Sequence, residues 1–307
     1  MKKILWFIHG YPPAHNAGAE WMAYDINESI KGEFDISVLT KNTQPEFQPG
    51  INFIEYQINQ IRPPFEKADL IITHLNWAGK AYNIAKALNK KIAYVIHNTN
   101  ENAIARRHKN RVNIIYNSNY TAGLDYPQES TICIPPIFPE RYKKPKTGEN
   151  AILLVNCWPD KGGKILIELA RKMPDRKFIG VLGGYGEQAT ADLKNLEYIK
   201  NTPNMADIYA RAEILIQPST YESWGKAACE AIATDTPVIC TETPGLKESM
   251  DFAAIYADRT PEAYKAEIEK MDVKAQIEKC RERTEQLQRQ GAEHIINLIK
   301  KLKTWEN

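Results

Sequence analysis

Residues 217–233 read QPSTYESWGKAACEAIA and follow the short apolar run Ile214–Ile216. The apolar run is typical of a buried strand, and the small, alanine-rich residues after Ser223 predict a helix that packs closely on a sheet. Between them lies a strand-to-helix turn that carries a carboxylate, Glu222. Ser223 is a good candidate for the helix N-cap. The free amides and the positive dipole end of such a helix favour an anion, and phosphate is the anion that helix N-termini commonly bind.

Two glutamates mark this segment. On a helical path, Glu222 and Glu230 lie about 12 Å apart along the axis. One carboxylate would then hold the sugar end of a nucleotide-sugar and the other the ribose, with the diphosphate between them at the helix start. Glutamates at this spacing are more often solvated surface charges. The apolar residues around Glu230 favour a functional role, because an unpartnered carboxylate is costly in such a setting.

The same residues resemble the donor-site motif of family 4 retaining glycosyltransferases, which have the GT-B fold. The positions that agree in order and spacing are Pro218-Ser219, the Glu-x7-Glu pair Glu222 and Glu230, Gly225, Pro237-Val238-Ile239, Gly245 and Glu248. A weaker resemblance extends over nearly the whole chain. It implies two Rossmann-like α/β domains that face each other across a cleft, and a C-terminal helix that returns to the first domain.

Length and composition agree with this class. The 307 residues are enough for two α/β domains, and 40 Lys and Arg against 38 Asp and Glu leave a formal charge of +2, without a whole-protein nucleic-acid or membrane signature. The five cysteines lack a Cys-x-x-Cys spacing and are typical of reduced core residues. The run at residues 4–8 predicts a buried strand rather than a signal peptide. We therefore expect a cytoplasmic protein that contacts the inner membrane face at most peripherally.

Apolar runs alternate with helix-like segments in the first half, which predicts a parallel sheet with crossover helices. The predicted strands are Ile4–Ile8, Asp35–Leu39, Asn52–Tyr56, Leu70–Thr73, Ile92–Ile96 and Ile114–Tyr116, with helices over Glu20–Ile30 and Trp77–Leu88. The second half repeats the pattern with strands Ala151–Val155, Phe178–Leu182 and Glu197–Lys200. It ends in a helical stretch over Ala266–Gln290, a break at Gly291 and a second stretch over Ala292–Leu302.

A stretch rich in Pro and Lys, without apolar periodicity, marks the linker between the halves. The predicted parts are an acceptor-side domain at 1–142, a linker at 143–150, a nucleotide-sugar-binding domain at 151–285 and a returning helix at 286–307.

Residues after the strands are candidates for ligand contacts, because ligands of parallel sheets bind beyond the carboxyl ends of the strands. Gly18 would let a backbone amide approach an anion, although an ordinary loop glycine is an equal alternative. His97 follows a predicted strand, and a lone histidine is more often structural than catalytic. The resemblance implies that Gly18 faces the donor diphosphate and that His97 contacts the donor sugar. Asn98 stands where family members commonly have Asp.

The resemblance also implies donor contacts in the second half. Lys161 matches a Lys-Gly step whose lysine contacts the diphosphate, while Cys157 stands where the family's arginine would align. Gly183 and Gly184 form a turn that the family places near the nucleotide, although the full Gly-x-Gly-x-x-Gly spacing is absent. The predicted catalytic residues are His97, Glu222 and Lys161. The predicted donor-binding set is Gly18, Lys161, Gly183, Gly184, Glu222, Ser223, Trp224, Gly225 and Glu230.

Residues 101–111 hold four basic residues against one acid. Such a segment is most commonly a solvated face. The alternative is a docking site for an anionic acceptor, such as a lipid phosphate, a membrane surface or a nucleic-acid backbone. No recognisable module supports nucleic acid specifically. The predicted acceptor residues are Arg106, Arg107, Lys109 and Arg111.

Together these features predict a retaining glycosyltransferase that moves a hexose-type sugar from a nucleoside diphosphate donor to a hydroxyl acceptor, such as a glycolipid, a polysaccharide precursor or another glycan. The sequence contains no Asp-x-Asp, so we expect a metal-independent reaction with no metal and no other cofactor. The alternatives are transfer to a modified nucleic-acid base, a GT-B-like nucleotide-sugar epimerase and a non-catalytic nucleotide-sugar binder.

Overall fold

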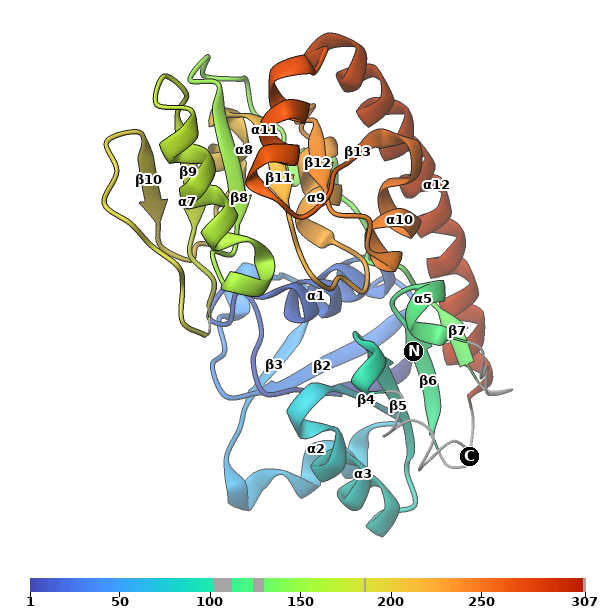
Figure 1. Cartoon of the computed structure of the whole chain (residues 1–307). Helices are drawn as coiled ribbons and strands as arrows, with labels where there is room; N and C mark the ends of the chain where they lie inside the picture. The colour runs from blue at the N-terminus through green and yellow to red at the C-terminus, as the bar shows by residue number, and fades with distance from the viewer. Residues whose placement is uncertain (102–111, 124–129, 185, 306–307) are drawn as a thin grey trace. The chain divides into compact units, whose positions relative to one another are not determined.

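A computed structural model describes residues 1–101, 112–123, 130–184 and 186–305 (Figure 1). The chain divides into two compact units. Unit 1 comprises residues 1–136 and 290–307, and unit 2 comprises residues 137–289. Each unit is built on one parallel sheet that carries helices. The prediction of an α/β chain with two parallel-sheet domains is confirmed.

The sheet of unit 1 has the strand order β3-β2-β1-β4-β5-β6-β7, and every neighbouring pair is parallel. The strands are β1 (Lys2–Phe7), β2 (Phe34–Thr40), β3 (Asn52–Glu55), β4 (Leu70–His74), β5 (Lys91–Ile96), β6 (Asn113–Tyr116) and β7 (Ser130–Ile132). The chain first adds β2 and β3 on one side of β1 and then places β4 on the other side. Between β1 and β4 the strand order therefore reverses, and sheets of this kind bind ligands at such a point.

Alternation of side chains along β1 gives unit 1 two cores. Ile4 and Trp6 pack with α1 (Gly18–Ile30) and the end of the last helix, whereas Leu5 and Phe7 pack with α2 (Arg62–Lys67) and α3 (Ala78–Ala87). Burial of these apolar surfaces stabilises the unit.

The sheet of unit 2 has the order β10-β9-β8-β11-β12-β13 and is also parallel throughout. Its strands are β8 (Ala151–Val155), β9 (Phe178–Val181), β10 (Leu196–Ile199), β11 (Ala212–Gln217), β12 (Val238–Cys240) and β13 (Ala254–Tyr256). Its helices are α6 (Pro139–Tyr142), α7 (Gly163–Lys172), α8 (Met205–Arg211), α9 (Lys226–Ile232), α10 (Pro244–Met250) and α11 (Pro261–Lys270). Helices α7 and α11 share one core with alternate residues of β8 and β11.

Short elements complete the description. Unit 1 also has α5 (Asn119–Ala122). The 3-10 turns are η1 (Pro45–Phe47), η2 (Ile58–Gln60), η3 (Leu75–Trp77), η4 (Thr99–Glu101), η5 (Pro159–Lys161) and η6 (Asp251–Ala253).

Helix α12 (Val273–Thr304) runs through Gly291 without interruption, so the predicted break at that residue is wrong. A glycine inside a helix costs only about 1 kcal/mol relative to alanine. Beyond Gly291, the buried side chains of Ile295, Leu298 and Leu302 join the core of unit 1, and this burial outweighs the cost.

The predicted helix over Ala266–Gln290 is also wrong, because α11 ends at Lys270 and a new helix starts at Val273. The carboxylate of Asp272 accepts a hydrogen bond from the amide of Ala275 at 3.1 Å. Asp272 thus acts as a helix-starting residue inside a stretch of uniformly helical composition.

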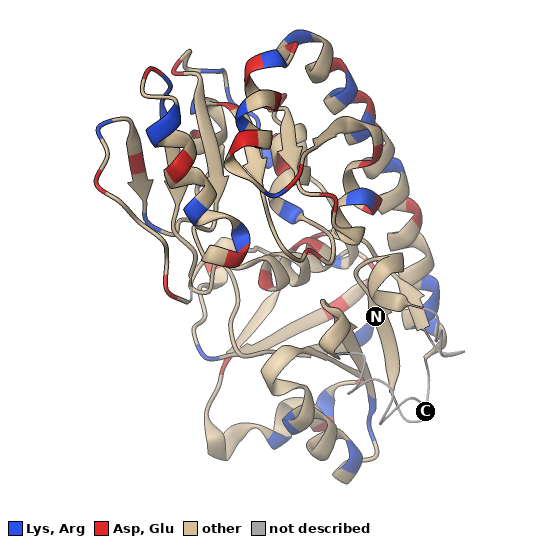
Figure 2. Cartoon of the chain, viewed as in Figure 1, with Lys and Arg blue, Asp and Glu red and all other residues tan. Residues whose placement is uncertain are grey.

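Charges of both signs are interspersed along α12 (Figure 2). In its last turn, Lys303 pairs with Glu33 at 2.6 Å. In the part of the chain that the structure describes, no helix is both long and apolar enough to span a bilayer.

Candidate functional site

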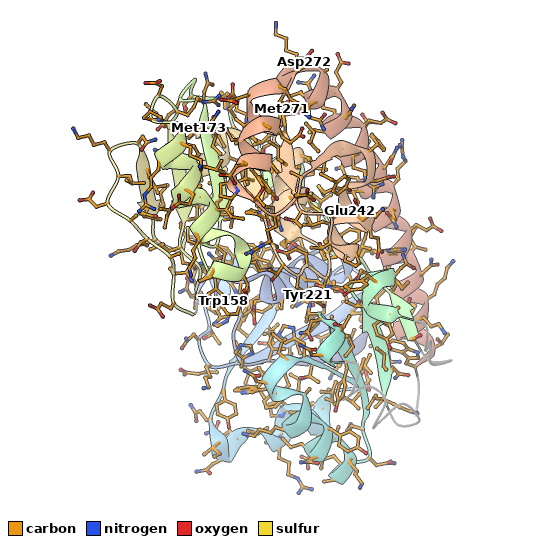
Figure 3. All side chains as sticks on the ribbon, viewed as in Figure 1. Trp158, Met173, Tyr221, Glu242, Met271 and Asp272 are labelled. Atoms are coloured by element: carbon orange, nitrogen blue, oxygen red, sulfur yellow. The ribbon has the colours of Figure 1, made fainter. Side chains whose placement is uncertain are left out.

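The loops that follow β8 and β11, which are neighbouring strands, form the first candidate site. Trp158 and Tyr221 of these loops lie at one edge of unit 2, whereas Met173 and Met271, which follow α7 and α11, lie at the opposite edge (Figure 3). The amide of Thr220 in one loop donates to the carbonyl of Asp160 in the other at 2.9 Å. The two loops therefore hold each other in place at the carboxyl ends of the strands.

A glycine at the start of α7 permits this packing. Gly162 has a φ of 104°, in the left-handed region, and a Cβ there would lie 2.0 Å from Cγ of Pro218. Only glycine fits both the conformation and the space. The glycine of the Lys-Gly step thus has a steric reason that is independent of any ligand.

Lys161 and Glu222 form an ion pair across the two loops, with 2.6 Å between Nζ and Oε1. The same carboxylate oxygen accepts hydrogen bonds from Nε2 of Gln217 at 2.9 Å and from Oγ of Ser219 at 2.8 Å. Lys161 also donates to the carbonyl of Tyr221 at 3.2 Å. Three donors therefore fix this oxygen, and two of the three predicted catalytic residues lie in direct contact.

The turn after Glu222 differs from the prediction. Helix α9 begins at Lys226, and its N-cap is Gly225, with a φ of 89°, so the assignment of Ser223 as the cap is wrong. The extra turn packs against α10. A Cβ at Gly245 would lie 2.3 Å from the carbonyl oxygen of Glu222, and Ser249 donates a hydrogen bond to the carbonyl of Trp224, which is buried.

Glu230 lies one helix turn after Lys226 and is buried, so the interpretation of a solvated surface charge is wrong. Its Oε1 accepts from the hydroxyl of Tyr142 at 3.1 Å, and its Oε2 accepts from the hydroxyl of Tyr209 at 2.9 Å. The ammonium of Lys226 lies 3.5 Å from Oε1. Burial, and then the carboxylate of Glu230, raise the pKa of Tyr209 well above its usual value, so its hydroxyl stays protonated and donates.

The glycine turn after β9 lies against the β8 loop. The amide of Gly183 donates to Oε1 of Gln188 at 2.8 Å, and a Cβ at Gly183 would lie 2.5 Å from Oδ1 of Asn156. Gly184 is exposed. The residues predicted to lie near the nucleotide are therefore adjacent to the loop that carries Lys161.

Cys157 lies in the loop after β8, and its side chain points into the core of unit 2. Its side chain is fully buried, and a Cβ at Gly180 would lie 2.7 Å from its sulfur. Burial raises the pKa of this thiol to about 12, so it is an inert thiol. An arginine in this orientation would not fit.

In unit 1, strand β5 is followed directly by His97, and the neighbouring strand β4 ends at His74. Nε2 of His97 lies 2.9 Å from Nδ1 of His74. Burial lowers the pKa of His97 to about 3, so its imidazole is neutral at neutral pH. Since one ring must donate to the other, the two tautomers are coupled.

A buried carboxylate lies beside this pair. Oε1 of Glu20, in the first turn of α1, lies 3.4 Å from Nε2 of His9, 3.8 Å from Nε2 of His15 and 4.0 Å from Nε2 of His74. Burial raises the pKa of Glu20 to about 7. We call His9, His15, His74 and Glu20 the unit 1 cluster.

Two other predicted site elements complete unit 1. Gly18 is the first residue of α1, and a Cβ there would meet no atom within 4 Å. Nothing in the described residues therefore requires a glycine at this position. The predicted acceptor residues Arg106, Arg107, Lys109 and Arg111 lie outside the described residues.

Residues 137–294 match the family model of glycosyl transferases group 1. The match covers more than half of the 307 residues and includes every predicted donor residue of unit 2. The chain belongs to this family. No curated protein sequence matches it.

Solved structures match this group 1 glycosyltransferase over nearly its whole length. Sucrose-phosphate synthase from Thermosynechococcus elongatus has a TM-score of 0.79 at 16% identity and 99% coverage of both chains. HepE from Anabaena in complex with UDP-glucose has a TM-score of 0.74 at 15% identity, with 99% and 98% coverage. A glycosyltransferase from Rickettsia africae has a TM-score of 0.73 at 14% identity and 99% coverage of both. At these identities the likeness shows the fold alone, and the predicted GT-B fold is confirmed.

Sequence reasoning missed two residues of the candidate sites, Arg259 and His74. Arg259 donates to the carbonyls of Pro218 and Pro159, both at 2.7 Å, and so connects the loops that follow β11 and β8. Nothing in its sequence context indicates this. His74 had a signal, because it follows the predicted strand Leu70–Thr73 directly, at the same edge as His97.

Proposed function

We propose that this protein is a family 4 retaining glycosyltransferase that transfers a hexose-type sugar from a nucleoside diphosphate donor to a hydroxyl acceptor. The observation that carries the proposal is the Lys161–Glu222 pair, held by Gln217 and Ser219 at the ends of β8 and β11. Membership of glycosyl transferases group 1 supports the reaction class.

Lys161 is the cation for the leaving group. When the bond between the sugar and the diphosphate breaks, negative charge develops on the phosphate, and a pre-positioned ammonium stabilises it. In the absence of donor, Glu222 balances the charge of Lys161 at 2.6 Å. With the donor bound, Lys161 pairs with the diphosphate instead of with Glu222, and Glu222 accepts hydrogen bonds from sugar hydroxyls. The turn of Ser223, Trp224 and Gly225 supplies backbone amides to the diphosphate.

Glu230 holds the ribose hydroxyls in this proposal. Tyr142 and Tyr209 each donate to one of its oxygens. Each carboxylate oxygen accepts more than one hydrogen bond, so this anchoring leaves capacity for a ligand. Gly183 and Gly184 lie near the nucleotide.

In unit 1 we assign Gly18 to the diphosphate and His97 to the donor sugar. The neutral imidazole of His97 serves as a hydrogen-bonding group rather than a cation. The leaving phosphate itself takes the proton of the acceptor, so no protein base is required. No divalent cation bridges the diphosphate, in keeping with the lack of Asp-x-Asp in the sequence.

The acceptor is a glycan or an anionic molecule, for which Arg106, Arg107, Lys109 and Arg111 are the proposed contacts, with peripheral membrane contact if the acceptor is a lipid. HepE was solved with UDP-glucose, which makes UDP-glucose the first donor to test. We place the reaction in the cytoplasm.

The test is release of free nucleoside diphosphate from UDP-, GDP-, ADP- and dTDP-sugars, with and without EDTA. Glu222→Gln removes the charge that pairs with Lys161. Glu242→Gln is the matched control, because Glu242 is an exposed glutamate of the same unit that pairs with Lys247 instead. We expect release that survives EDTA, disappears in Glu222→Gln and persists in Glu242→Gln.

Other outcomes would indicate one of the alternative functions or would contradict a part of the proposal. Isomerised sugar without acceptor would indicate an epimerase, and donor binding without release across an acceptor panel would indicate a non-catalytic binder. A product with inverted anomeric configuration by NMR would refute retention. Equal release by Glu222→Gln and the wild type would remove Glu222 from the site.

A further inference from the structure

The unit 1 cluster gathers side chains from three parts of the chain. His9 and His15 come from the loop after β1, Glu20 comes from α1 and His74 ends β4. These positions lie where the strand order reverses between β1 and β4. All approach one oxygen, Oε1 of Glu20, at 3.4 to 4.0 Å. The donor-site proposal uses none of these four side chains.

The cluster is unsatisfied as it stands. Among the described residues, Oε1 of Glu20, Nδ1 of His9 and Nε2 of His74 are buried side-chain atoms without a hydrogen-bond partner. Buried polar groups are nearly always paired, and an unpaired one costs stability. No protein group in the described residues therefore completes the hydrogen bonding of this cluster.

We propose that His9, His15 and Glu20 bind a divalent first-row transition-metal ion, of which Zn²⁺ is the first to test. One ligand atom from each of the three residues can be chosen so that all lie within 4.8 Å of one another. Zinc with bonds of about 2.0–2.1 Å in a tetrahedral site needs ligand atoms about 3.3 Å apart. The observed 3.4 and 3.8 Å from Glu20 to the two imidazoles are close to this spacing.

The ligand chemistry selects the class of ion. Two imidazoles and one carboxylate suit zinc, cobalt, nickel or iron, whereas magnesium and calcium prefer all-oxygen sites. Metal binding requires neutral imidazoles. The ammonium of Lys41 acts on His9 as a like charge, and it would weaken the binding of a cation there.

Three protein ligands leave a fourth position for water or for a substrate oxygen. His74 borders the site with an unpartnered Nε2, and its other nitrogen is held by His97 at 2.9 Å. Such an outer-shell contact orients groups around a metal. The ion would pin the loop after β1 to α1. None of the three proposed metal ligands is among the residues proposed to contact the donor, although Gly18, proposed for the diphosphate, lies two residues before Glu20.

The test uses the full-length protein after treatment with EDTA and removal of the chelator. Co²⁺ is added as a spectroscopic probe and Zn²⁺ as the competitor, and bound metal is counted by atomic emission. Two variants remove ligands. His15→Ala changes a half-exposed side chain, with little risk to folding, and Glu20→Gln keeps the volume of a buried one. His294→Ala is the control, a histidine of the same unit that instead accepts from the amide of Ile134 at 3.4 Å.

We expect one equivalent of Co²⁺ with visible absorption of a four- or five-coordinate site, displaced by Zn²⁺, and a rise in the unfolding temperature on metal addition. Each ligand variant should weaken binding by more than the roughly 10–100-fold that loss of an outer-shell partner causes. His294→Ala should bind like the wild type. Two results would overturn the proposal. One is the absence of stoichiometric metal binding in the wild type, and the other is that His15→Ala and Glu20→Gln bind metal as tightly as the wild type does. Because the readout is metal binding, the result is independent of glycosyl transfer.

Discussion

The carboxylates beside the two sheets differ in how their charge is satisfied. In unit 2, Glu222 has a lysine, an amide and a hydroxyl on one oxygen, and Glu230 has a tyrosine hydroxyl on each oxygen. In unit 1, Glu20 is more deeply buried than either, but its Oε1 has imidazoles at 3.4 Å and beyond and no hydrogen bond. The protein thus supplies hydrogen-bond partners to the two carboxylates of unit 2, which we call the complete site, and leaves Oε1 of Glu20 in unit 1 without one. In unit 2, a bound ligand would replace hydrogen bonds that the carboxylates already make within the protein. In unit 1, a bound ion would supply a contact that Glu20 lacks.

The largest effect should follow from removing the lysine of the complete site. Lys161→Ala takes away the cation for the leaving group, and we expect turnover to fall by about 10²–10³. The fold should persist, because Gln217 and Ser219 still donate to Glu222. Turnover is measured by nucleoside diphosphate release. Lys164→Ala, an exposed lysine on the first turn of α7, is the control. Turnover of Lys161→Ala within twofold of the wild type would break the comparison on the unit 2 side.

The hydroxyls that hold Glu230 should matter for stability. Tyr209→Phe removes a buried donor to a carboxylate, so we expect the free energy of unfolding to fall by about 1.5–3 kcal/mol. Tyr264→Phe is the matched control, since this buried hydroxyl pairs with the neutral hydroxyl of Thr241 at 3.1 Å. We expect about 0.5–1.5 kcal/mol there. Urea unfolding of both variants measures the difference, and equal losses would mean that the charge of Glu230 adds nothing.

Glu20 should behave in the opposite way. In metal-free protein, Glu20→Gln replaces a buried carboxylate whose Oε1 has no partner by a neutral group of similar volume. We expect no loss of stability and a gain of up to about 1 kcal/mol. Urea unfolding in EDTA measures it. A loss of 2 kcal/mol or more would show that the imidazoles already stabilise Glu20, and the contrast between the two units would fail.

The fold was largely predictable from the sequence, because short apolar runs alternating with helical segments have few solutions other than parallel sheets. The end of β5 at Ile96 was predicted correctly for the same reason, and β11 ends at Gln217, one residue beyond the predicted Ile216. Details that depend on packing were not predictable. Ser223 has the right chemistry for a cap, but close packing of Gly245 on the chain moves the helix start to Lys226. The unit 1 cluster depends on strand order, which brings together residues as distant as His9 and His74.

The smallest effect concerns a carboxylate that is partnered near the surface. Glu149 accepts two hydrogen bonds from Arg211, at 2.7 and 3.1 Å, and this guanidinium lowers the pKa of Glu149 below its ordinary 4.5. A lowered folded-state pKa contributes stability that is present above pH 4.5 and is lost as the pH falls through the folded-state value. We therefore expect Glu149→Gln to lower the free energy of unfolding at pH 7 by about 1 kcal/mol.

The difference in the free energy of unfolding between Glu149→Gln and the wild type, here called the gap, should disappear as the pH falls below 4.5, the ordinary pKa of Glu149. Urea unfolding from pH 7 to pH 3 measures it. Glu269→Gln is the control, because Glu269 pairs with Lys265 along an exposed helix face and should show a smaller gap at every pH. A gap for Glu149→Gln that is constant with pH would mean that its oxygens act as neutral acceptors. In that case the carboxylates of unit 2 would differ from Glu20 in the hydrogen bonds that they accept, and not in the stabilisation of their negative charge.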